Sequence, residues 1–426
     1  SNNNVIDFNM MTGGGIQTFL LVTNTNISNN IIAATGTVIT LINNSGKVFN
    51  NRLTTSSSSS YGIYSPGYNN LTNNTIIINS SSSYSTSSGI YVNGLFNNII
   101  NNTINVTNSS DSNSWGIVIY GGSGSVLRGN QIDTDRNYAI YVNSNNVNDY
   151  NQTIDSTNTE EGEPIYYYYG NSSITLQDTT NIGQLYLANC NNISVGNVSL
   201  DKDGIILAFT NNTRISESVV NISDSAYFGY YPILFYYSDY NNLSNSTVIN
   251  NGSNSGSLRL DNSGYNNFNA NSITTLSGSS SIQNINFAGT SNSNNFTSNS
   301  INNYGDNGKG FDLSTNNNIL TGNNITCTGS GSKNVVISGN ANTLNSNNIN
   351  NTASDGYAVS LEFGAFSAQN TILLNNNIIS NGNVISDTAS GMPVNNYLIY
   401  NNSFGEINWN KSNTNLNTNI NLSVGS

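Results

Sequence analysis

The feature that most constrains this chain is a short pattern that returns about every 22 to 29 residues. The pattern is an apolar residue, two variable positions, asparagine, one variable position and a second apolar residue. One copy contains Leu71, Asn74 and Ile76, and a later copy is built around Asn323. A fixed period of this length predicts a repeat architecture in which each unit packs on its neighbours.

Each repeat also carries a short segment of alternating apolar and other residues, such as Ile90 to Val92 or Val335 to Ile337. Alternation over three to five residues is typical of short strands with one inward and one outward face. Strands this short also occur in sandwiches and antiparallel barrels, but the regular recurrence favours a solenoid. We therefore expect an all-β parallel β-helix with about 13 coils of roughly 25 residues.

The asparagine of the repeat falls where one strand bends into the next. Asparagine tolerates left-handed backbone angles there, and its amide can both donate to and accept from the next coil. The sequence thus predicts a structural ladder of amides consisting of Asn74, Asn102, Asn130, Asn271, Asn299, Asn323, Asn347 and Asn376.

The patterns divide the chain into three segments. Residues 1–30 are expected to form an N-terminal strand or cap segment, residues 31–404 the β-helix, and residues 405–426 a C-terminal strand segment. Both end segments contain alternating apolar residues and no capping helix. Open strand edges recruit other chains, so we expect self-association through the ends.

Segments such as Asn97–Ile104 resemble the right-handed parallel β-helix repeats of the pectate-lyase-like and NosD-like class. In its Asn, Ser and Thr content the chain is most similar to adhesin-like surface proteins of methanogenic archaea. The resemblance covers roughly residues 30–404 and implies right-handed coils and an extracellular or cell-surface location. Enzymes of the resembled class cleave acidic polysaccharides with Asp pairs, or with Ca²⁺ and a basic residue, and the resemblance implies these as the activities to consider.

The composition excludes several kinds of function. The chain has no histidine, which removes His-based triads and His metal ligands. A net charge of −12 and only 10 basic residues argue against nucleic acid and against an acidic polymer as substrate. No apolar run is long enough to cross a membrane as a helix. No catalytic residue and no enzyme activity are expected.

A series of aspartates recurs about every 22 to 23 residues and would line one edge of a solenoid with that coil length. Hard cations such as Ca²⁺ would relieve the repulsion along such a stripe. The alternative is a turn position at which Asp replaces Asn. The candidate ligands are Asp111, Asp133, Asp155, Asp178, Asp201 and Asp224.

A second series places apolar or aromatic residues on the outward side of one strand for about seven coils, after which polar residues follow. A contiguous apolar surface of this size usually marks an interface, and tyrosine suits a half-hydrated contact. Alternatively, residues 143–163 or the N-terminal segment cover the stripe, or sugars stack on its rings. The series is Tyr91, Val118, Tyr141, Tyr166, Tyr186, Ile206 and Leu234.

These expectations lead to a secreted structural protein that self-assembles into a filament, sheath or surface layer. The alternative is an adhesin-like module that binds polysaccharide or a cell surface. A polysaccharide lyase or hydrolase is a second alternative. Ca²⁺ is the one candidate cofactor, and a second copy of the chain or a surface polysaccharide are the candidate partners.

Overall fold

The computed structural model describes most of the chain. The described residues are 5–14, 16–17, 24–42, 45–57, 59–80, 86–108, 113–135, 137–222, 230–252, 255–276, 283–362, 370–387, 398–400, 402–404 and 410–411. Among them, no helix is both long and apolar enough to span a membrane.

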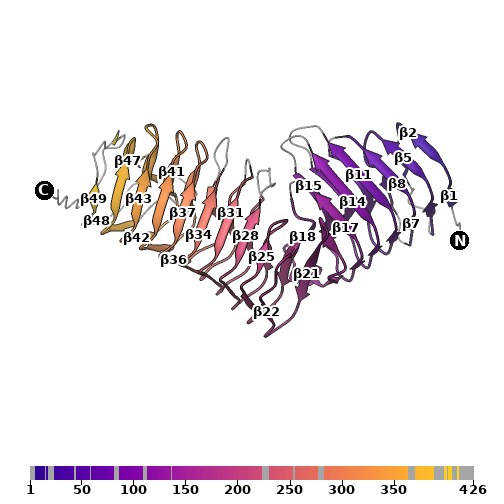
Figure 1. The fold of residues 1–426 in the computed structure, drawn as a ribbon, viewed down its shortest axis with the longest axis horizontal. Helices are drawn as coiled ribbons and strands as arrows, with labels where there is room; N and C mark the ends of the chain where they lie inside the picture. Colours follow the sequence, from indigo (N-terminus) through magenta and orange to yellow (C-terminus); the bar gives the residue numbers. More distant parts are fainter. Residues whose placement is uncertain are drawn as a thin grey trace.

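The first part of the chain forms a stack of coils with three parallel sheets, and successive strands go to each sheet in turn (Figure 1). Sheet I contains β1 (Val5–Asp7), β4 (Asn26–Ser28), β7 (Lys47–Phe49), β10 (Asn70–Thr72), β13 (Asn98–Ile100), β16 (Val126–Arg128) and β19 (Thr153–Ile154). Sheet II contains β2 (Met10–Thr12), β5 (Ile31–Ala34), β8 (Arg52–Thr55), β11 (Thr75–Ser80), β14 (Thr103–Asn108), β17 (Gln131–Thr134) and β20 (Thr159–Glu160). Sheet III contains β3 (Ile16–Gln17), β6 (Ile39–Thr40), β9 (Tyr61–Ser65), β12 (Thr86–Val92), β15 (Asn113–Tyr120) and β18 (Ile140–Asn143).

The second part repeats this arrangement from β21 onward, and a 3₁₀ turn, η1 (Val147–Tyr150), lies between β18 and β19 of the first part. Sheet IV contains β21 (Glu163–Tyr169), β23 (Gln184–Ala188), β26 (Ile205–Ala208), β29 (Ile233–Tyr236), β32 (Leu258–Asp261), β35 (Gln283–Ala288), β38 (Lys309–Leu313), β41 (Lys333–Ile337), β44 (Tyr357–Leu361), β47 (Asn383–Asp387) and β50 (Asn410–Lys411). Sheet V contains β22 (Thr175–Gln177), β24 (Ser194–Gly196), β27 (Arg214–Ser216), β30 (Asn242–Ser244), β33 (Asn267–Asn269), β36 (Asn295–Thr297), β39 (Ile319–Thr321), β42 (Thr343–Asn345), β45 (Ile372–Leu374) and β48 (Leu398–Tyr400). Sheet VI contains β25 (Ser199–Leu200), β28 (Val219–Ile222), β31 (Thr247–Asn250), β34 (Ser272–Thr275), β37 (Ser300–Asn303), β40 (Asn324–Cys327), β43 (Asn348–Asn351), β46 (Asn377–Ser380) and β49 (Ser403–Phe404).

The core is a column of inward side chains that stack on their own kind. Ile76 pairs in register with Ile104, and Ile104 with Ile132, and all three are buried. Full burial of such a side chain contributes roughly 1.5–3 kcal/mol. Because every coil repeats the same inward positions, the alternation seen in the sequence is sufficient to specify this core. The predicted parallel β-solenoid is confirmed.

The repeat asparagines lie in buried columns at the bends between strands. The amide nitrogen of Asn74 donates to the side-chain oxygen of Asn102 at 3.0 Å, and Asn102 donates in the same way to Asn130. In the second stack the column runs through Asn271, Asn299, Asn323, Asn347, Asn376 and Asn402. Each of these amides also donates to a backbone carbonyl, so its polar atoms are satisfied inside the protein.

The two stacks are joined by a tight hairpin that the repeat pattern does not predict. β20 pairs antiparallel with β21 through Glu160 and Glu163, and the two loop residues, Glu161 and Gly162, both have positive φ. Two positive φ angles are required by a type I′ turn, the usual two-residue hairpin turn. Because β17 and β20 are parallel and β21 and β23 are parallel, the strands after the hairpin run opposite to those before it.

The expected segment boundaries at residues 30 and 404 have no counterpart in the sheets. β1 pairs with β4, and β50 pairs with β47, so the described terminal strands extend the same stacks. The physical division lies at the hairpin, because there the strand direction changes.

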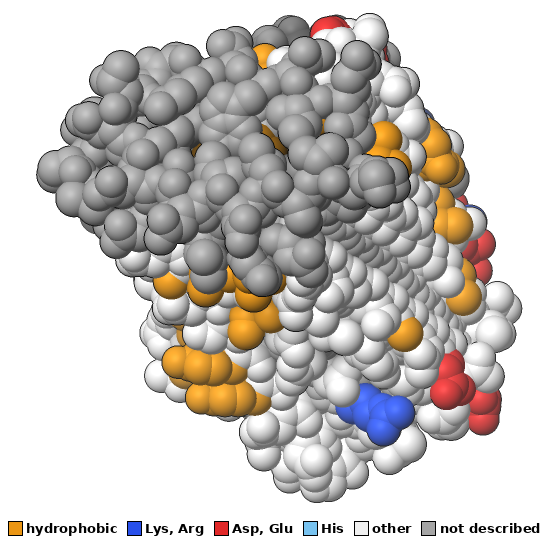
Figure 2. Space-filling view, turned by 90° about the vertical axis from the view of Figure 1, so that its left-hand side faces the viewer, with side chains coloured by type: hydrophobic (Ala, Val, Ile, Leu, Met, Phe, Trp, Pro, Cys, Tyr) orange, Lys and Arg blue, Asp and Glu red, His pale blue; other side chains and the backbone are white. Residues whose placement is uncertain are grey.

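The molecule is bent where the stacks meet, with β15, β18 and β21 at the bend (Figure 1). The side chain of Gln184 bonds to both backbone polar groups of Ile140, and the Tyr186 hydroxyl donates to the carbonyl of Val142 at 3.2 Å. The open edge of β18, the last strand of sheet III, therefore packs on outward side chains of sheet IV. Seen from the C-terminal end, most of the visible described surface is uncharged (Figure 2).

Candidate functional site

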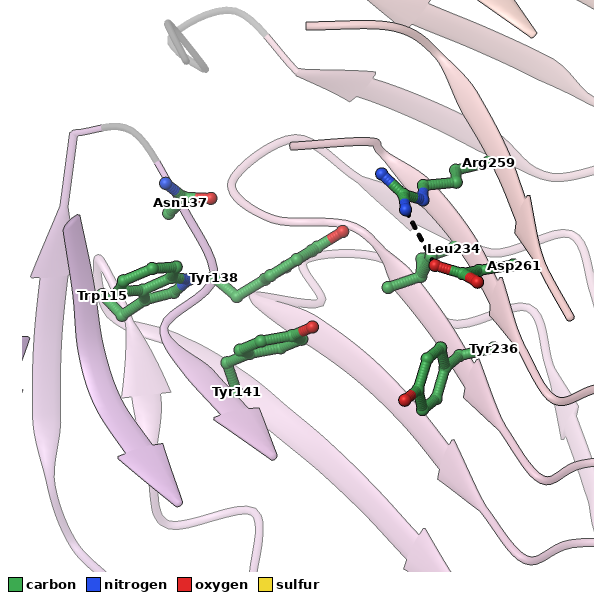
Figure 3. Close-up of a pocket in the computed structure, with 8 residues that line it drawn as sticks. All are labelled: Trp115, Asn137, Tyr138, Tyr141, Leu234, Tyr236, Arg259 and Asp261. Atoms are coloured by element: carbon green, nitrogen blue, oxygen red, sulfur yellow. Dashed lines mark hydrogen bonds and ion pairs between the residues drawn. The ribbon is translucent and has the colours of Figure 1, made fainter. Parts of the chain in front are cut away.

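The inside of the bend holds a pocket of about 150 Å³, which we call the crease pocket. From the first stack it is lined by Trp115, Asn137, Tyr138 and Tyr141, and from the second by Leu234, Tyr236, Arg259 and Asp261. These two sets of side chains face each other across the pocket (Figure 3). The pocket thus exists only because the bend brings together strands that are far apart in the sequence.

Strand alternation places the lining residues of the second stack. On β32, Leu258 and Leu260 are buried in the core, so Arg259 and Asp261 project from the outer face. Tyr236 is the register partner of Asp261 on the adjacent strand. In the first stack, the buried neighbours Ile140 and Val142 leave Tyr141 on the outer face by the same rule.

Aromatic rings form one wall of the pocket. Trp115 and Tyr141 lie nearly parallel, with ring centroids 6.2 Å apart and an interplanar angle of 8°. The ring of Tyr138 lies 5.4 Å from that of Tyr141. The Tyr138 hydroxyl donates to the carbonyl of Tyr231 at 2.8 Å and so fixes its ring across the bend.

Polar groups occupy the opposite wall. The Arg259 guanidinium is paired with the Asp261 carboxylate at 2.8 Å and lies 5.8 Å from the centre of the Tyr231 ring. Asn137 lies on the side of the aromatic wall (Figure 3), and its amide nitrogen is buried without a hydrogen-bond partner among the described residues. A buried donor without a partner costs about 1–3 kcal/mol.

The electrostatic environment keeps the Tyr141 hydroxyl neutral and the Arg259 guanidinium charged near neutral pH. Burial raises the pKa of the Tyr141 hydroxyl, and the charge of Arg259 only partly opposes this rise. Burial acts to lower the pKa of Arg259, but Tyr231 and Asp261 outweigh it and raise the pKa. The pocket therefore presents neutral phenols beside a paired cation.

Beneath the pocket, two buried carboxyl groups help to join the stacks. Asp203 accepts hydrogen bonds from the Ala139 amide at 2.9 Å and from the Tyr230 hydroxyl at 3.0 Å. Burial raises the pKa of Asp203 to about 7 despite these bonds. Burial and the charge of Asp203 raise the pKa of Glu160 well above its ordinary value. Neither carboxyl lines the pocket, so we assign both to the junction.

A row of tyrosines leads to the pocket along the outer face of sheet III. Tyr64 stacks on Tyr91 with centroids 5.7 Å apart and an interplanar angle of 10°, and Tyr61 lies 4.6 Å from Tyr91. Tyr91, Val118 and Tyr141 are consecutive register partners. The row thus ends at the aromatic wall.

The structure divides the predicted apolar stripe between the two stacks. Tyr186, Ile206 and Leu234 are register partners on sheet IV, but Tyr166 pairs with Leu185 and lies outside this row. Instead Tyr167 takes its place, because the hairpin shifts the alternation by one residue.

Most of the stripe is covered within the molecule. Val118, Tyr186, Ile206 and Leu234 are each no more than 7% exposed. Tyr150 of η1, from the segment 143–163, contacts Tyr186 with ring centroids 6.3 Å apart. Of the alternatives left open, the geometry therefore favours internal cover for these four residues, while Tyr91 and Tyr141 remain partly exposed.

The aspartates of the predicted cation stripe do not share an edge. The four described ones lie at different places in the coil, namely Asp133 within β17, Asp155 after β19, Asp178 after β22 and Asp201 after β25. Residues at equivalent positions in adjacent coils of this region are separated by 28, 27, 19 or 20 residues. Aspartates that are 22 or 23 residues apart therefore fall at a different position in each successive coil. Asp155 is instead paired with Arg128. Asp111 and Asp224 lie outside the described residues.

In the part of the chain that the structure describes, no group of three or more acidic or cysteine side chains could hold a metal ion. The sequence did not single out Trp115, Asn137, Tyr138 or Asp261. The one sequence pattern that indicates part of this pocket is the alternation on β32, which places Arg259 and Asp261 on the same outward face.

No protein-family model and no curated protein sequence matches the chain. Among solved structures, the chain is similar to a mutant of the periplasmic alginate epimerase AlgG, with 11% identity, a TM-score of 0.43, and coverage of 89% of this chain and 77% of that one. It is also similar to the A-module of the Azotobacter vinelandii mannuronan C-5 epimerase AlgE6, with 12% identity, a TM-score of 0.27, and coverage of 93% and 92%. The Dettilon tailspike protein matches with 11% identity, a TM-score of 0.34, and coverage of 85% and 62%.

These similarities concern the parallel β-helix fold. They correct two expectations drawn from the sequence, namely that the protein is a self-assembling structural filament and that it is not an enzyme. The similar structures are named as an alginate epimerase, a mannuronan C-5 epimerase and a tailspike.

Proposed function

We propose that the protein is polysaccharide-active and binds a glycan chain in the crease pocket and along the tyrosine row of sheet III. The observation that carries this proposal is the aromatic wall of Trp115, Tyr138 and Tyr141 facing Arg259 and Asp261. Because such polymers lie outside the cytoplasm, an extracellular location is part of the proposal.

The aromatic wall suits the apolar face of a sugar ring. The C–H groups of a pyranose form a flat apolar patch, and a tryptophan or tyrosine ring buries such a patch at little cost in conformational freedom. The parallel arrangement of Trp115 and Tyr141 offers two such rings in one wall. Tyr91 and Tyr64 extend the same chemistry for further sugar residues outside the pocket.

The opposite wall suits sugar hydroxyls. The Asp261 carboxylate accepts hydrogen bonds, and the guanidinium N–H groups of Arg259 donate them. A mostly apolar pocket with a few fixed polar groups is the usual form of a ligand site. Its volume is below the roughly 300–1,000 Å³ of drug-sized sites, and so it fits one residue of a longer chain.

The chain offers a built-in reporter for binding, because it has only two tryptophans and Trp115 lines the pocket. Replacing the other, in the variant Trp409→Phe, leaves fluorescence that reports on the pocket. Titration of this variant with a panel of soluble polysaccharides should change the emission of Trp115 for at least one polymer.

Binding should weaken about two- to tenfold in Tyr141→Ala, since an aromatic contact contributes roughly 0.5–1.5 kcal/mol beyond burial. Tyr304→Ala is the matched control, because Tyr304 is 47% exposed and does not line the pocket. Equal loss in both variants, or no emission change with any polymer, would refute the proposal. Chromatography of the polymers after incubation extends the same assay from binding to turnover.

A further inference from the structure

Four exposed aromatic residues occupy the same turn position of the coil, two in each stack. The position lies two residues before a strand of sheet I or sheet V. In the first stack the ring centroids of Tyr68 and Phe96 are 5.5 Å apart, and in the second those of Tyr240 and Tyr265 are 5.1 Å apart. Each of the four residues is between 47% and 57% exposed. We call the two pairs the aromatic ledges.

A bulky residue is a costly choice at this turn position. All four ring-bearing residues have φ between 54° and 58°, a left-handed conformation that Gly and Asn adopt most easily. Other coils place Ser45, Asn212 or Asn317 at the same point. One ring–ring contact returns less than two strained positions cost. The fold alone therefore does not account for rings at these turns.

The same polar groups flank both ledges. The strand that follows each ring begins with an asparagine, and these are Asn70, Asn98, Asn242 and Asn267. In the coil before each ledge, the register partner of the first asparagine is a cation, which is Lys47 in the first stack and Arg214 in the second. Both cations are exposed, and neither is paired with a carboxylate in the part of the chain that the structure describes.

The arrangement therefore occurs once in each stack, as a cation followed by two coils that each carry a ring and an amide. Sheets I and V are separate sheets, so the two copies do not build one common surface of a single sheet. Exposed side chains are not needed to fill the core of the coils. Recurrence of the same exposed set in both stacks indicates a surface that binds a ligand.

The size and chemistry of a ledge suit sugar residues better than a protein partner. Two half-exposed rings present roughly 200 Å² of aromatic surface, whereas a stable protein interface buries roughly 800 Å² on each partner. A flat ring packs against the C–H face of a sugar. The neighbouring amides donate to and accept from its hydroxyls, and the ammonium or guanidinium group adds further donors.

We infer that the two aromatic ledges are glycan-binding sites, each taking one or two residues of a polysaccharide outside the crease pocket. None of the four rings lines that pocket. The inference rests on the proposed polysaccharide-active role, but it assigns sites of its own, so the two can be tested separately.

The test uses affinity electrophoresis of the full chain through gels that contain glucomannan, mixed-linkage β-glucan or alginate. The variants replace the rings of one ledge by asparagine, as Tyr240→Asn with Tyr265→Asn or as Tyr68→Asn with Phe96→Asn. Retardation by at least one polymer should weaken roughly two- to tenfold for each ring removed. Because asparagine tolerates the left-handed turn, the melting temperature should stay the same or rise.

The control removes exposed apolar side chains elsewhere. Tyr304→Asn with Leu276→Asn serves this purpose, because these residues are 47% and 46% exposed and lie outside both ledges and the crease pocket. This double variant should migrate as the unsubstituted protein does. The Trp115 emission change at saturating polymer, measured in the Trp409→Phe background, should persist in both ledge variants.

The outcomes separate the ledges from the pocket. If the ledge variants melt several degrees lower and are retarded as strongly as the unsubstituted protein, the rings serve the fold and the inference is refuted. Retardation that is lost in Tyr141→Ala but kept in the ledge variants leaves the proposed function standing and also refutes the ledges. Retardation that is lost in the ledge variants without any response of Trp115 supports the ledges and refutes the pocket. If no polymer retards the protein or changes its emission, both proposals fail.

Discussion

Replacing Asn299 by alanine should be among the most damaging single substitutions in this protein. Asn299 is 2% exposed and belongs to the amide column of the second stack. Its side-chain nitrogen donates to the carbonyl of Phe268 and to the amide oxygen of Asn323, both at 2.9 Å. Its side-chain oxygen accepts from the backbone and side-chain nitrogens of Asn271 at 2.9 and 3.0 Å.

The magnitude follows from the groups that Asn299→Ala leaves behind. The backbone N–H of Asn271 loses the acceptor described above, and the carbonyl of Phe268 loses a donor. Each buried polar group left in this way costs about 1–3 kcal/mol, so the two groups together should lower the unfolding free energy by about 2–6 kcal/mol. Water cannot easily replace the missing amide, because the column lies inside the bend between two strands.

Urea denaturation followed by circular dichroism measures the loss, and hydrogen exchange of residues 267–275 locates it. The control is Asn269→Ala, two residues from Asn271 on an exposed position of β33, which should change stability by less than about 0.5 kcal/mol. If both variants unfold at the same urea concentration, the amide column does not hold the coils together.

Three further predictions test other parts of the structure. The protein should melt at a higher temperature at pH 5 than at pH 8. Folding raises the pKa of Asp203 from 3.8 to about 7. An acid whose pKa rises on folding stabilises the fold fully below its unfolded pKa, and this contribution is lost as the pH rises through the folded pKa of about 7. Between pH 5 and pH 8 the loss for Asp203 is on the order of 3 kcal/mol, and Glu160→Gln should reduce the pH dependence, since the pKa of Glu160 shifts in the same direction. Gly116→Ala should lower the melting temperature by several degrees, because a Cβ atom there would lie 2.5 Å from a backbone carbonyl oxygen of the next coil. Gly36→Ala is the control and should leave the melting temperature unchanged, because the space around Gly36 is open. Cys327 should resist alkylation at pH 8 until the protein unfolds, because burial raises the pKa of its thiol to about 12; rapid labelling of the native protein would contradict this.

Most of the fold could be predicted because it depends on positions that repeat. Ile76 and Asn74 recur at equivalent places in successive coils, and both the alternation and the amide column act between neighbouring coils. The turn of Glu161 and Gly162 occurs once, so no period indicates it. That single turn shifts the register, which is why Tyr167 rather than Tyr166 faces Tyr186.

The candidate site could be predicted only in part. Tyr141 and Leu234 were placed on outward faces by alternation, and the crease pocket does contain both. Their apposition could not be foreseen, because it results from the bend between two stacks. The aspartate series failed for a related reason, since its spacing matched an average coil length and not the local ones.

The sequence by itself determined a parallel β-solenoid with an apolar core, amide columns and little charge, because these features arise from contacts between adjacent repeats. Only the tertiary structure decided that the solenoid reverses strand direction at residues 160–163 and bends there. The bend buries much of what looked like an exposed apolar stripe and sets Trp115 opposite Arg259. Contacts between neighbouring coils leave a periodic trace in the sequence, whereas contacts across the bend are made once and leave none.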